Sequence, residues 1–241
     1  MTLPDSALPD TTPARPSFLE KLPPAPRRAL ISALGLTAFT VFFTALMAFT
    51  HEVTRERIQA AAEQQQMRLV NEVLPTEHYD NALLSDYIDA DDRNEAHVGR
   101  IWRARSGQTP VALVFNTFAP DGYGGRIDLI VSLDVDGHIG GVRVASHKET
   151  PGLGDYIDPA KDRDRQNPWI RQFAGKDATL PLAHWAVKKD GGDFDFHAGA
   201  TVSPRAVTRA VGRAAAWVHA RRDALFAAPK ETHFNAEGEK Q

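Results

Sequence analysis

The sequence predicts an α+β domain, built from an antiparallel sheet and packed helices, behind one N-terminal transmembrane helix and a helical stalk. An uncharged apolar run from Ala29 to Thr50 indicates the membrane helix. Strict apolar–polar alternation from Ile127 to Val135, followed by Asp136-Gly137, predicts a half-buried strand that enters a hairpin. Apolar residues recur at helical spacing from Val207 to Val218, which predicts a helix with one buried face.

The composition limits the classes of function. The chain has 241 residues and a net charge of −3, so one globular domain with appendages fits and no basic surface for nucleic acid is expected. Cysteine is absent, which excludes disulfides, Fe–S clusters and thiolate zinc sites within this chain. The acidic stretch 80–94 lacks the central glycine of a calcium loop, so a solvated surface is favoured over a cation site and no metal is expected.

The N-terminal third divides into three segments. Residues 1–26 are rich in proline and predict a disordered cytoplasmic tail, with a docking arm as the alternative. Residues 27–50 predict the transmembrane helix, because about 22 residues at about 1.5 Å each exceed a bilayer core of about 30 Å. A cleaved signal peptide is the alternative, but the apolar run is too long and lacks a small-x-small cleavage site. Residues 51–75 predict a polar helical stalk that ends at Leu74-Pro75.

The remaining sequence predicts one domain over residues 76–226 and a frayed tail over 227–241. Three short strands are expected besides the alternating one, at 111–115, 142–144 and 184–187, with a turn at 121–125. The charged stretch 159–177 is expected on the surface, attached to the core through Trp169, Ile170 and Phe173.

A small-residue loop, Asp195 to Thr201, leads into the C-terminal helix. Ser203 suits the N-cap, and Pro204 suits the first helical position, where a missing N–H has no cost. Because a helix N-terminus offers free N–H groups and partial positive charge, a phosphate is favoured near Thr201. Gly199 and Ala200 would let a bulky group approach the backbone. The plain alternative is an ordinary loop followed by a capped helix.

The same loop resembles the flavinylation motif, an Asp followed by Ser/Thr-Gly-Ala-Thr, whose last Thr carries FMN through a phosphoester. Ala198 stands where that motif has Ser or Thr. Together with residues 187–195, the loop is similar to the G subunits of the Rnf (Rsx) ion-translocating electron-transport family, which are related to the C subunit of the Na+-translocating NADH:quinone reductase. The resemblance implies an FMN-binding domain, with Thr201 as the covalent attachment residue and Gly199 and Ala200 beside it.

A second stretch, His147 to Asp155, contains a Pro-Gly turn in which Gly152 and Gly154 are free to take positive φ. By itself it fits a plain loop or an acid–base pair of His147 and Glu149. Its string Glu-Thr-Pro-Gly-Leu-Gly resembles a signature of flavinylated Rnf subunits. The resemblance implies flavin contact for Thr150, Pro151, Gly152, Leu153 and Gly154, and no catalytic residue.

The resemblance implies an electron-carrying function. The chain would be a single-pass protein of the cell inner membrane with a periplasmic C-terminal domain, and it would relay electrons within an ion-translocating complex. Its partners would be the other subunits, a separate flavin transferase that attaches FMN, and the lipid bilayer, but not nucleic acid. One alternative is an FMN-binding regulatory or reductase-associated module outside an ion pump. Another is an assembly subunit whose Thr201 stays unmodified.

Overall fold

The computed structural model describes residues 24–91 and 93–234. The expected disorder of residues 1–23 and of 235–241 lies outside the described residues. Contacts divide the chain at Ala61/Ala62 into two units, which are described separately.

The first unit consists of the greater part of helix α1 (Pro24–Val73). Its stretch Arg28–Arg55 is long and apolar enough to cross a membrane, and none of it is buried in the protein. The hydroxyls of Thr40 and Thr50 donate to the carbonyls four residues earlier, at 2.9 and 2.8 Å. These bonds satisfy polar groups that would otherwise face an apolar environment. The helix begins at Pro24 and runs without interruption through the expected span and stalk.

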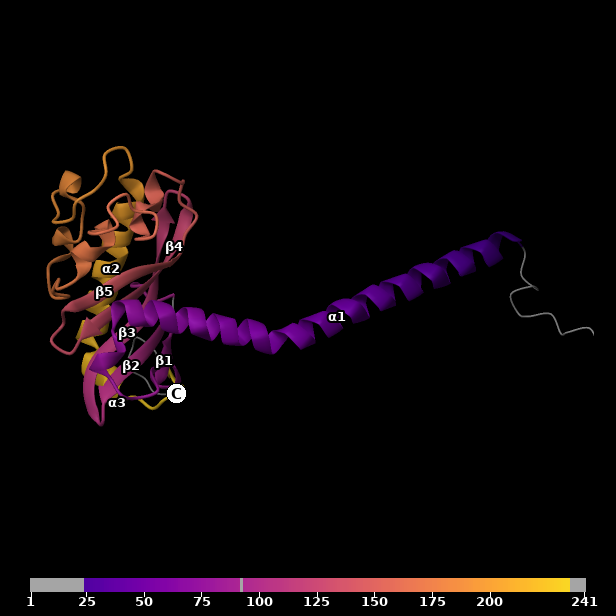
Figure 1. The fold of residues 1–241 in the computed structure, drawn as a ribbon, viewed down its shortest axis with the longest axis horizontal. Coiled ribbons are helices and arrows are strands. Elements are labelled where there is room, and N and C mark those ends of the chain that lie inside the picture. The colour runs from indigo at the N-terminus through magenta and orange to yellow at the C-terminus, as the bar shows by residue number, and fades with distance from the viewer. Residues whose placement is uncertain (1–23, 92, 235–241) are drawn as a thin grey trace, which may run out of the picture. The chain divides into compact units, whose positions relative to one another are not determined.

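The second unit is built on a six-stranded sheet in the order β5-β4-β3-β2-β1-β6 (Figure 1). Its strands are β1 (Tyr87–Ala90), β2 (Arg100–Ser106), β3 (Thr109–Gly122), β4 (Gly125–Asp134), β5 (Ile139–Ser146) and β6 (His233–Phe234). Strands β1 to β5 pair antiparallel, and β6 is parallel to β1. The α+β prediction is confirmed, with β6 as a parallel addition.

Strand β3 extends well beyond the expected 111–115. It pairs with β4 from Ala112 to Gly122, although the register shifts between Ala119 and Gly122. Gly122 pairs with Gly125, so the hairpin turn is confined to Tyr123-Gly124. Polar residues in the second half of β3 interrupt the apolar pattern, so the sequence did not reveal the full length of the strand. They are tolerated there because the backbone groups of the strand are paired with neighbouring strands.

Two hydrophobic clusters lie on opposite faces of the sheet. On one face, the helix α2 (Val202–Ala220) packs through the predicted stripe, and all of its members are buried: Val207, Ala210, Val211, Ala214, Ala215 and Val218. Trp169, Ile170 and Phe173 join this cluster, as predicted. On the other face, Val70 and Val73 at the end of α1 pack on Trp102, Val114 and Ile130.

The end of α1 is fixed by the sheet as well as by proline. The buried Ser132 hydroxyl donates to the Val73 carbonyl at 2.6 Å, and Arg143 pairs with Glu72 at 2.9 Å. Gly141 lies so close that a Cβ there would be 3.1 Å from Val73 Cα. The predicted helix end before Pro75 is confirmed.

Two local predictions are wrong. Residues 184–187 are not a strand; Leu182–His184 form a turn of 3-10 helix, and Val187 makes a single bridge to Phe194. Asp86, expected on a solvated surface, is buried against Arg103 Nε at 2.8 Å. The isolated charge would be too costly to bury, but the pair is compatible with the interior.

The described part of the C-terminal tail forms regular structure. Helix α3 (Arg222–Ala227) is followed by β6, and Asp89 of β1 lies opposite His233. The buried Arg103 guanidinium also donates to the Leu225 carbonyl at 3.1 Å and to the Ala228 carbonyl. This buried cation therefore holds a segment that local composition predicted to be frayed.

Candidate functional site

The expected attachment residue, Thr201, is the N-cap of α2 and is half-buried. Gly199 before it adopts a φ of +85°, and the Ala200 N–H donates to the His197 carbonyl at 3.1 Å, so the chain turns sharply into the helix. The Thr201 hydroxyl makes no hydrogen bond to any residue that the structure describes. The backbone N–H groups of Val202 and Ser203, the first two of the helix, also make no hydrogen bond to the described residues. A hydroxyl without a partner in the described part of the chain thus lies next to donors that also have none there, at a helix N-terminus, an arrangement that suits a phosphate.

The loop before Thr201 is held by the core. Trp169 donates from its indole N–H to the Asp195 carbonyl at 2.6 Å, and the Asp195 N–H donates to Gln172 Oε1 at 2.7 Å. The Asp195 carboxylate faces solvent and pairs with Lys188 Nζ at 2.6 Å. Backbone contacts therefore fix the position of Asp195 and leave its carboxylate exposed at the entrance to the loop.

Tyr156 connects the two informative stretches of the sequence. It follows the Pro-Gly turn in a 3-10 helix, Gly154–Ile157. Its hydroxyl donates to the Ala200 carbonyl and accepts the His197 N–H, both at 3.1 Å, and its ring stacks on His197 at 3.9 Å. Burial raises the pKa of Tyr156 to about 12; the His197 N–H opposes this shift, and the nearby Asp162 adds to it. The phenol therefore stays protonated and can donate to the loop.

In the Pro-Gly turn, Gly152 takes the positive φ that the sequence allowed, and Gly154 does not. Gly152 has a φ of +75°, and its N–H donates to Asp155 Oδ1 at 2.8 Å. The amides of Leu153 and Gly154 both donate to the Thr150 carbonyl, at 3.1 and 3.2 Å. Pro151 is exposed in this turn. A residue with a side chain would be strained at the φ of Gly152.

Gly154 brings the Pro-Gly turn against the start of α2. A Cβ at this position would lie 2.4 Å from Ser203 Oγ and 2.8 Å from Glu149 Oε2. Such contacts are far inside van der Waals distance, so only glycine lets the two segments approach this closely. Glycine is required here by packing, and at Gly152 by backbone conformation.

Ser203 does not cap the helix, so that prediction is wrong. The helix begins two residues earlier than predicted, at Val202, and the buried Ser203 hydroxyl donates to Glu149 Oε2 instead. Glu149 is 5% exposed, and its other oxygen accepts the Gly124 N–H at 2.9 Å. The Glu149 side chain therefore joins three segments: the β3–β4 turn, the Pro-Gly turn and the start of α2.

A pocket of about 540 Å³ lies between the two loops. Among the expected site residues, Gly152, Leu153 and Ala200 line it; Thr150, Pro151, Gly154, Gly199 and Thr201 do not. Charged side chains form much of the remaining wall: Asp155, Lys161, Asp162, Arg163 and Asp164. The structure therefore brings the two stretches together around one cavity, with Thr201 just outside its lining.

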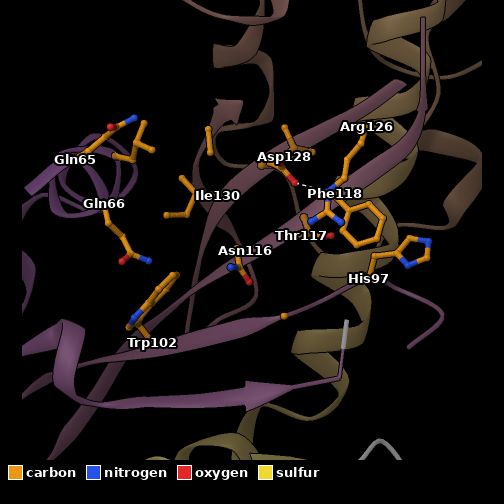
Figure 2. A pocket seen from close by; sticks show the side chains of 14 residues that line it. Gln65, Gln66, His97, Trp102, Asn116, Thr117, Phe118, Arg126, Asp128 and Ile130 are labelled. Carbon is orange, nitrogen blue, oxygen red and sulfur yellow. Dashed lines mark hydrogen bonds and ion pairs between the residues drawn. The ribbon is translucent and has the colours of Figure 1, made fainter. Parts of the chain in front are cut away.

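A second pocket, of about 390 Å³, lies on the opposite face of the sheet (Figure 2). Gln65 and Gln66 reach it from α1, and Trp102, Asn116 and Ile130 line it from the strands, as Figure 2 shows. At its other end Arg126 lies 3.7 Å from the Phe118 ring and pairs with Asp128 at 2.6 Å. None of the expected site residues lines this pocket.

Sequence reasoning missed the connecting residues. The sequence leaves Glu149 in a plain loop or an acid–base pair, predicts a cap at Ser203, and does not single out Tyr156. Glu149 had a usable signal, since a carboxyl group directly before a Pro-Gly turn must find donors if the turn is packed. No local pattern marked Tyr156, because both of its hydrogen bonds reach residues more than forty positions away.

Comparison with known proteins covers both units. A family described as the FMN-binding domain matches residues 122–216, which include both loops, and one described as the RnfG N-terminal region matches residues 25–73.

Several similar proteins are each named as the G subunit of an ion-translocating oxidoreductase complex. The protein from Vibrio atlanticus is 40% identical over 201 residues, 82% of this chain and 94% of that protein. The one from Escherichia coli (strain K12) is 44% identical over 183 residues, 75% and 86% of the two chains. The one from Pseudomonas aeruginosa is 42% identical over 217 residues, 86% and 96%. With relatives this similar over most of its length, the chain belongs to the family of G subunits of ion-translocating oxidoreductase complexes.

Proposed function

We propose that this protein is a membrane-anchored electron carrier in an ion-translocating oxidoreductase complex, with FMN linked to Thr201 through a phosphoester. The observation that carries the attachment residue is the half-buried Thr201 at the N-terminus of α2, whose hydroxyl has no hydrogen-bond partner among residues 24–91 and 93–234. The names of the relatives support a place in such a complex rather than a separate regulatory module. Other subunits of the complex are therefore the expected partners.

The residues present fit the phosphate of FMN. The amides of Val202 and Ser203 point out of the helix start with no partner among the described residues, and the helix dipole favours an anion there. Gly199 and Ala200 leave the backbone open beside Thr201, and Gly152 and Leu153 lie across the adjoining pocket. When bound, the flavin supplies the redox chemistry, and the chain supplies position and environment.

Attachment requires a separate flavin transferase. The Thr201 oxygen forms the new bond to phosphorus and loses its proton, while the leaving group of an activated flavin nucleotide departs with the bonding pair. No described side chain contacts the Thr201 hydroxyl through a hydrogen bond, so none of the described residues is placed as a base for the step. A separate enzyme must remove the proton.

The membrane arrangement follows from α1. We propose a cytoplasmic tail over residues 1–26, a span over 27–50, a stalk over 51–75 and a periplasmic flavin domain over 76–226. Arginine and lysine before the span slightly outnumber those directly after it, which favours this orientation in the inner membrane. A covalent tether would then retain the cofactor in a compartment where free FMN could diffuse away.

The test is co-expression of the full-length chain with a flavin transferase, followed by denaturing electrophoresis. The parent band is expected to fluoresce, and Thr201→Ala is expected to abolish the fluorescence at near-normal expression. Ser203→Ala, the matched control, keeps the acceptor hydroxyl and is expected to keep the flavin. Mass spectrometry of the peptide that contains both residues locates the added mass. A flavin on Ser203, or on the Thr201→Ala chain, would refute the assignment.

A further inference from the structure

One face of helix α2 is not buried, and all of its charged residues are arginines. Twelve of the 19 residues of the helix are buried. At about 3.6 residues per turn, all but one of the others lie within an arc of about 80°. We call this arc the arginine face; its members are Val202, Arg205, Arg209, Arg213, Ala216 and Ala220.

The positive charge of the arginine face is only partly neutralised. Arg205 pairs with Asp190 through its Nε and Nη2 atoms, the latter 2.6 Å from Asp190 Oδ1. This bond holds the pKa of Asp190 below its usual value, and the charges of Arg209 and Lys189 lower it further. One carboxylate thus serves three cations. Arg209 and Arg213 themselves make no hydrogen bond, ion pair or ring contact with the residues that the structure describes.

The stability of the helix does not explain this charge pattern. The first turn of α2 contains no acidic residue, although the positive end of the helix dipole favours acids and disfavours Arg205 there. Arginines four residues apart also repel each other along the helix surface. A surface that only has to stay in water usually mixes both signs of charge. The uniform positive charge therefore indicates a negatively charged binding partner.

The arginines are not placed to hold a phosphate on Thr201. The Arg205 guanidinium is already bonded to Asp190. Arg209 and Arg213 lie about 12 and 18 Å from Thr201 along the helix axis, at about 1.5 Å per residue, which is too far for contact with a phosphate there. The arginine face nevertheless begins at the residue after Thr201, so a partner bound on it lies beside the attachment point.

We propose that the arginine face is the docking surface for an acidic electron-transfer protein domain, which exchanges electrons with the flavin. This inference rests on the proposed attachment of FMN to Thr201. In each encounter one electron passes between the flavin and the redox centre of the partner, and the flavin exchanges its protons with solvent. Charge complementarity speeds the encounter and selects the partner, because opposite potentials attract before the surfaces touch.

The size and position of the arginine face suit such a partner. Weak electron-transfer complexes use smaller interfaces than permanent complexes do, so a single helix face with its surroundings is enough. Ala216 and Ala220 at its far end are small and let another surface come close to the helix. An anionic lipid surface would also match the charge, but only an electron-transfer partner gains from a short distance to the flavin.

The experiment measures electron transfer from the flavinylated full-length chain, purified in uncharged detergent and reduced without oxygen. Ferric cytochrome b5 is the acidic probe, and ferric cytochrome c is the basic probe; each haem iron takes one electron from the flavin. Arg209→Gln/Arg213→Gln removes two charges, and Arg209→Lys/Arg213→Lys keeps them. Lys230→Gln is the control for loss of an exposed cation away from α2. Stopped-flow absorbance gives the second-order rate constants at about 0.01 and 1 M salt, where the Debye lengths are about 30 and 3 Å.

Electrostatic steering changes association rates by about 10- to 1,000-fold in total, so at low salt the glutamine pair is expected to slow cytochrome b5 by about 3- to 30-fold. At high salt it should match the parent, and cytochrome c should not be slowed at either salt concentration. The lysine pair and Lys230→Gln should keep the parent rates. An unchanged rate with cytochrome b5 at low salt, or an equal loss in the lysine pair, would overturn the proposal.

Two other results would assign the arginine face to a different partner and so refute the proposal. If the glutamine pair carries less flavin on a denaturing gel, the flavin transferase reads this surface. If the glutamine pair slows cytochrome b5 in nanodiscs of neutral lipid but not in nanodiscs that contain phosphatidylglycerol, the surface lies against anionic lipid. A parent chain without attached flavin would instead refute the function proposed above, which is a distinguishable result.

Discussion

The contact between Glu149 and Ser203 can be tested by a double-mutant cycle. Ser203→Ala removes a buried hydroxyl that donates to Glu149 Oε2, and it leaves that oxygen without its partner. Such a loss costs about 1–2 kcal/mol of unfolding free energy. Glu149→Ala also deprives the Gly124 N–H of its acceptor, so we expect a larger cost, about 2–4 kcal/mol.

The two costs are expected not to add. Once Glu149 is truncated, the Ser203 hydroxyl has already lost its acceptor, so removing it costs little more. The structure therefore predicts a coupling energy of about 1–2 kcal/mol between the two substitutions. If Ser203 were an N-cap, its removal would cost about 1 kcal/mol in either background, because a cap bonds only to its own helix.

The assay is denaturant unfolding of the full-length chain in detergent, monitored through tryptophan fluorescence. Parent, both single variants and the double variant are compared at the same detergent concentration. Thr208→Ala in the Glu149→Ala background serves as the control, because the Thr208 hydroxyl is buried and donates to the Arg205 carbonyl of its own helix. Additive costs for Glu149 and Ser203 would refute the bridge between the Pro-Gly turn and α2.

Further outcomes are expected for Gly152, for Tyr156 and for the membrane span. Gly152→Val should lower the free energy of unfolding by about 1–3 kcal/mol through backbone strain alone, since φ is +75° and no atom lies within 4 Å of the added Cβ. The flavin should stay on the denatured chain, while the spectrum of the native protein shifts. Identical spectra for parent and variant would place the turn away from the flavin. Tyr156→Phe should lower the thermal midpoint at neutral pH by removing two hydrogen bonds. The Tyr156 pKa rises from 10.0 to about 12 on folding, so the unfolded state loses that proton at lower pH than the folded state. The parent therefore loses stability between those pH values, and the difference in thermal midpoint between parent and variant should narrow there. A difference that stays constant would contradict this. The chain should stay with membranes after alkaline washing because of the apolar stretch Arg28–Arg55, and a soluble full-length chain would contradict this. A reporter that is active only outside the cytoplasm should be active when fused after Gln241, and a silent fusion would contradict the proposed orientation.

The sequence alone predicted the helices and strands that are specified by residues close together in the chain. The apolar run of α1, the alternation of β4 and the buried stripe of α2 depend on neighbours within one or two turns or on alternate residues, so periodicity reveals them. The helix end before Pro75 and the positive φ of Gly152 follow from the chemistry of one or two residues. The motif at 195–201 could be matched to a family for the same reason, because it is contiguous.

Only the tertiary structure decided how distant segments share polar groups. The Ser203 hydroxyl could have capped its own helix or bonded to a distant group. It donates to Glu149, which lies 54 residues away in the sequence. The chain around Leu225 and Ala228 is held in place because Arg103, more than 120 positions earlier, needs carbonyl acceptors in the interior. A buried polar group must be paired, but composition and periodicity do not say with which group, because that depends on which segments the packed sheet and helices bring together.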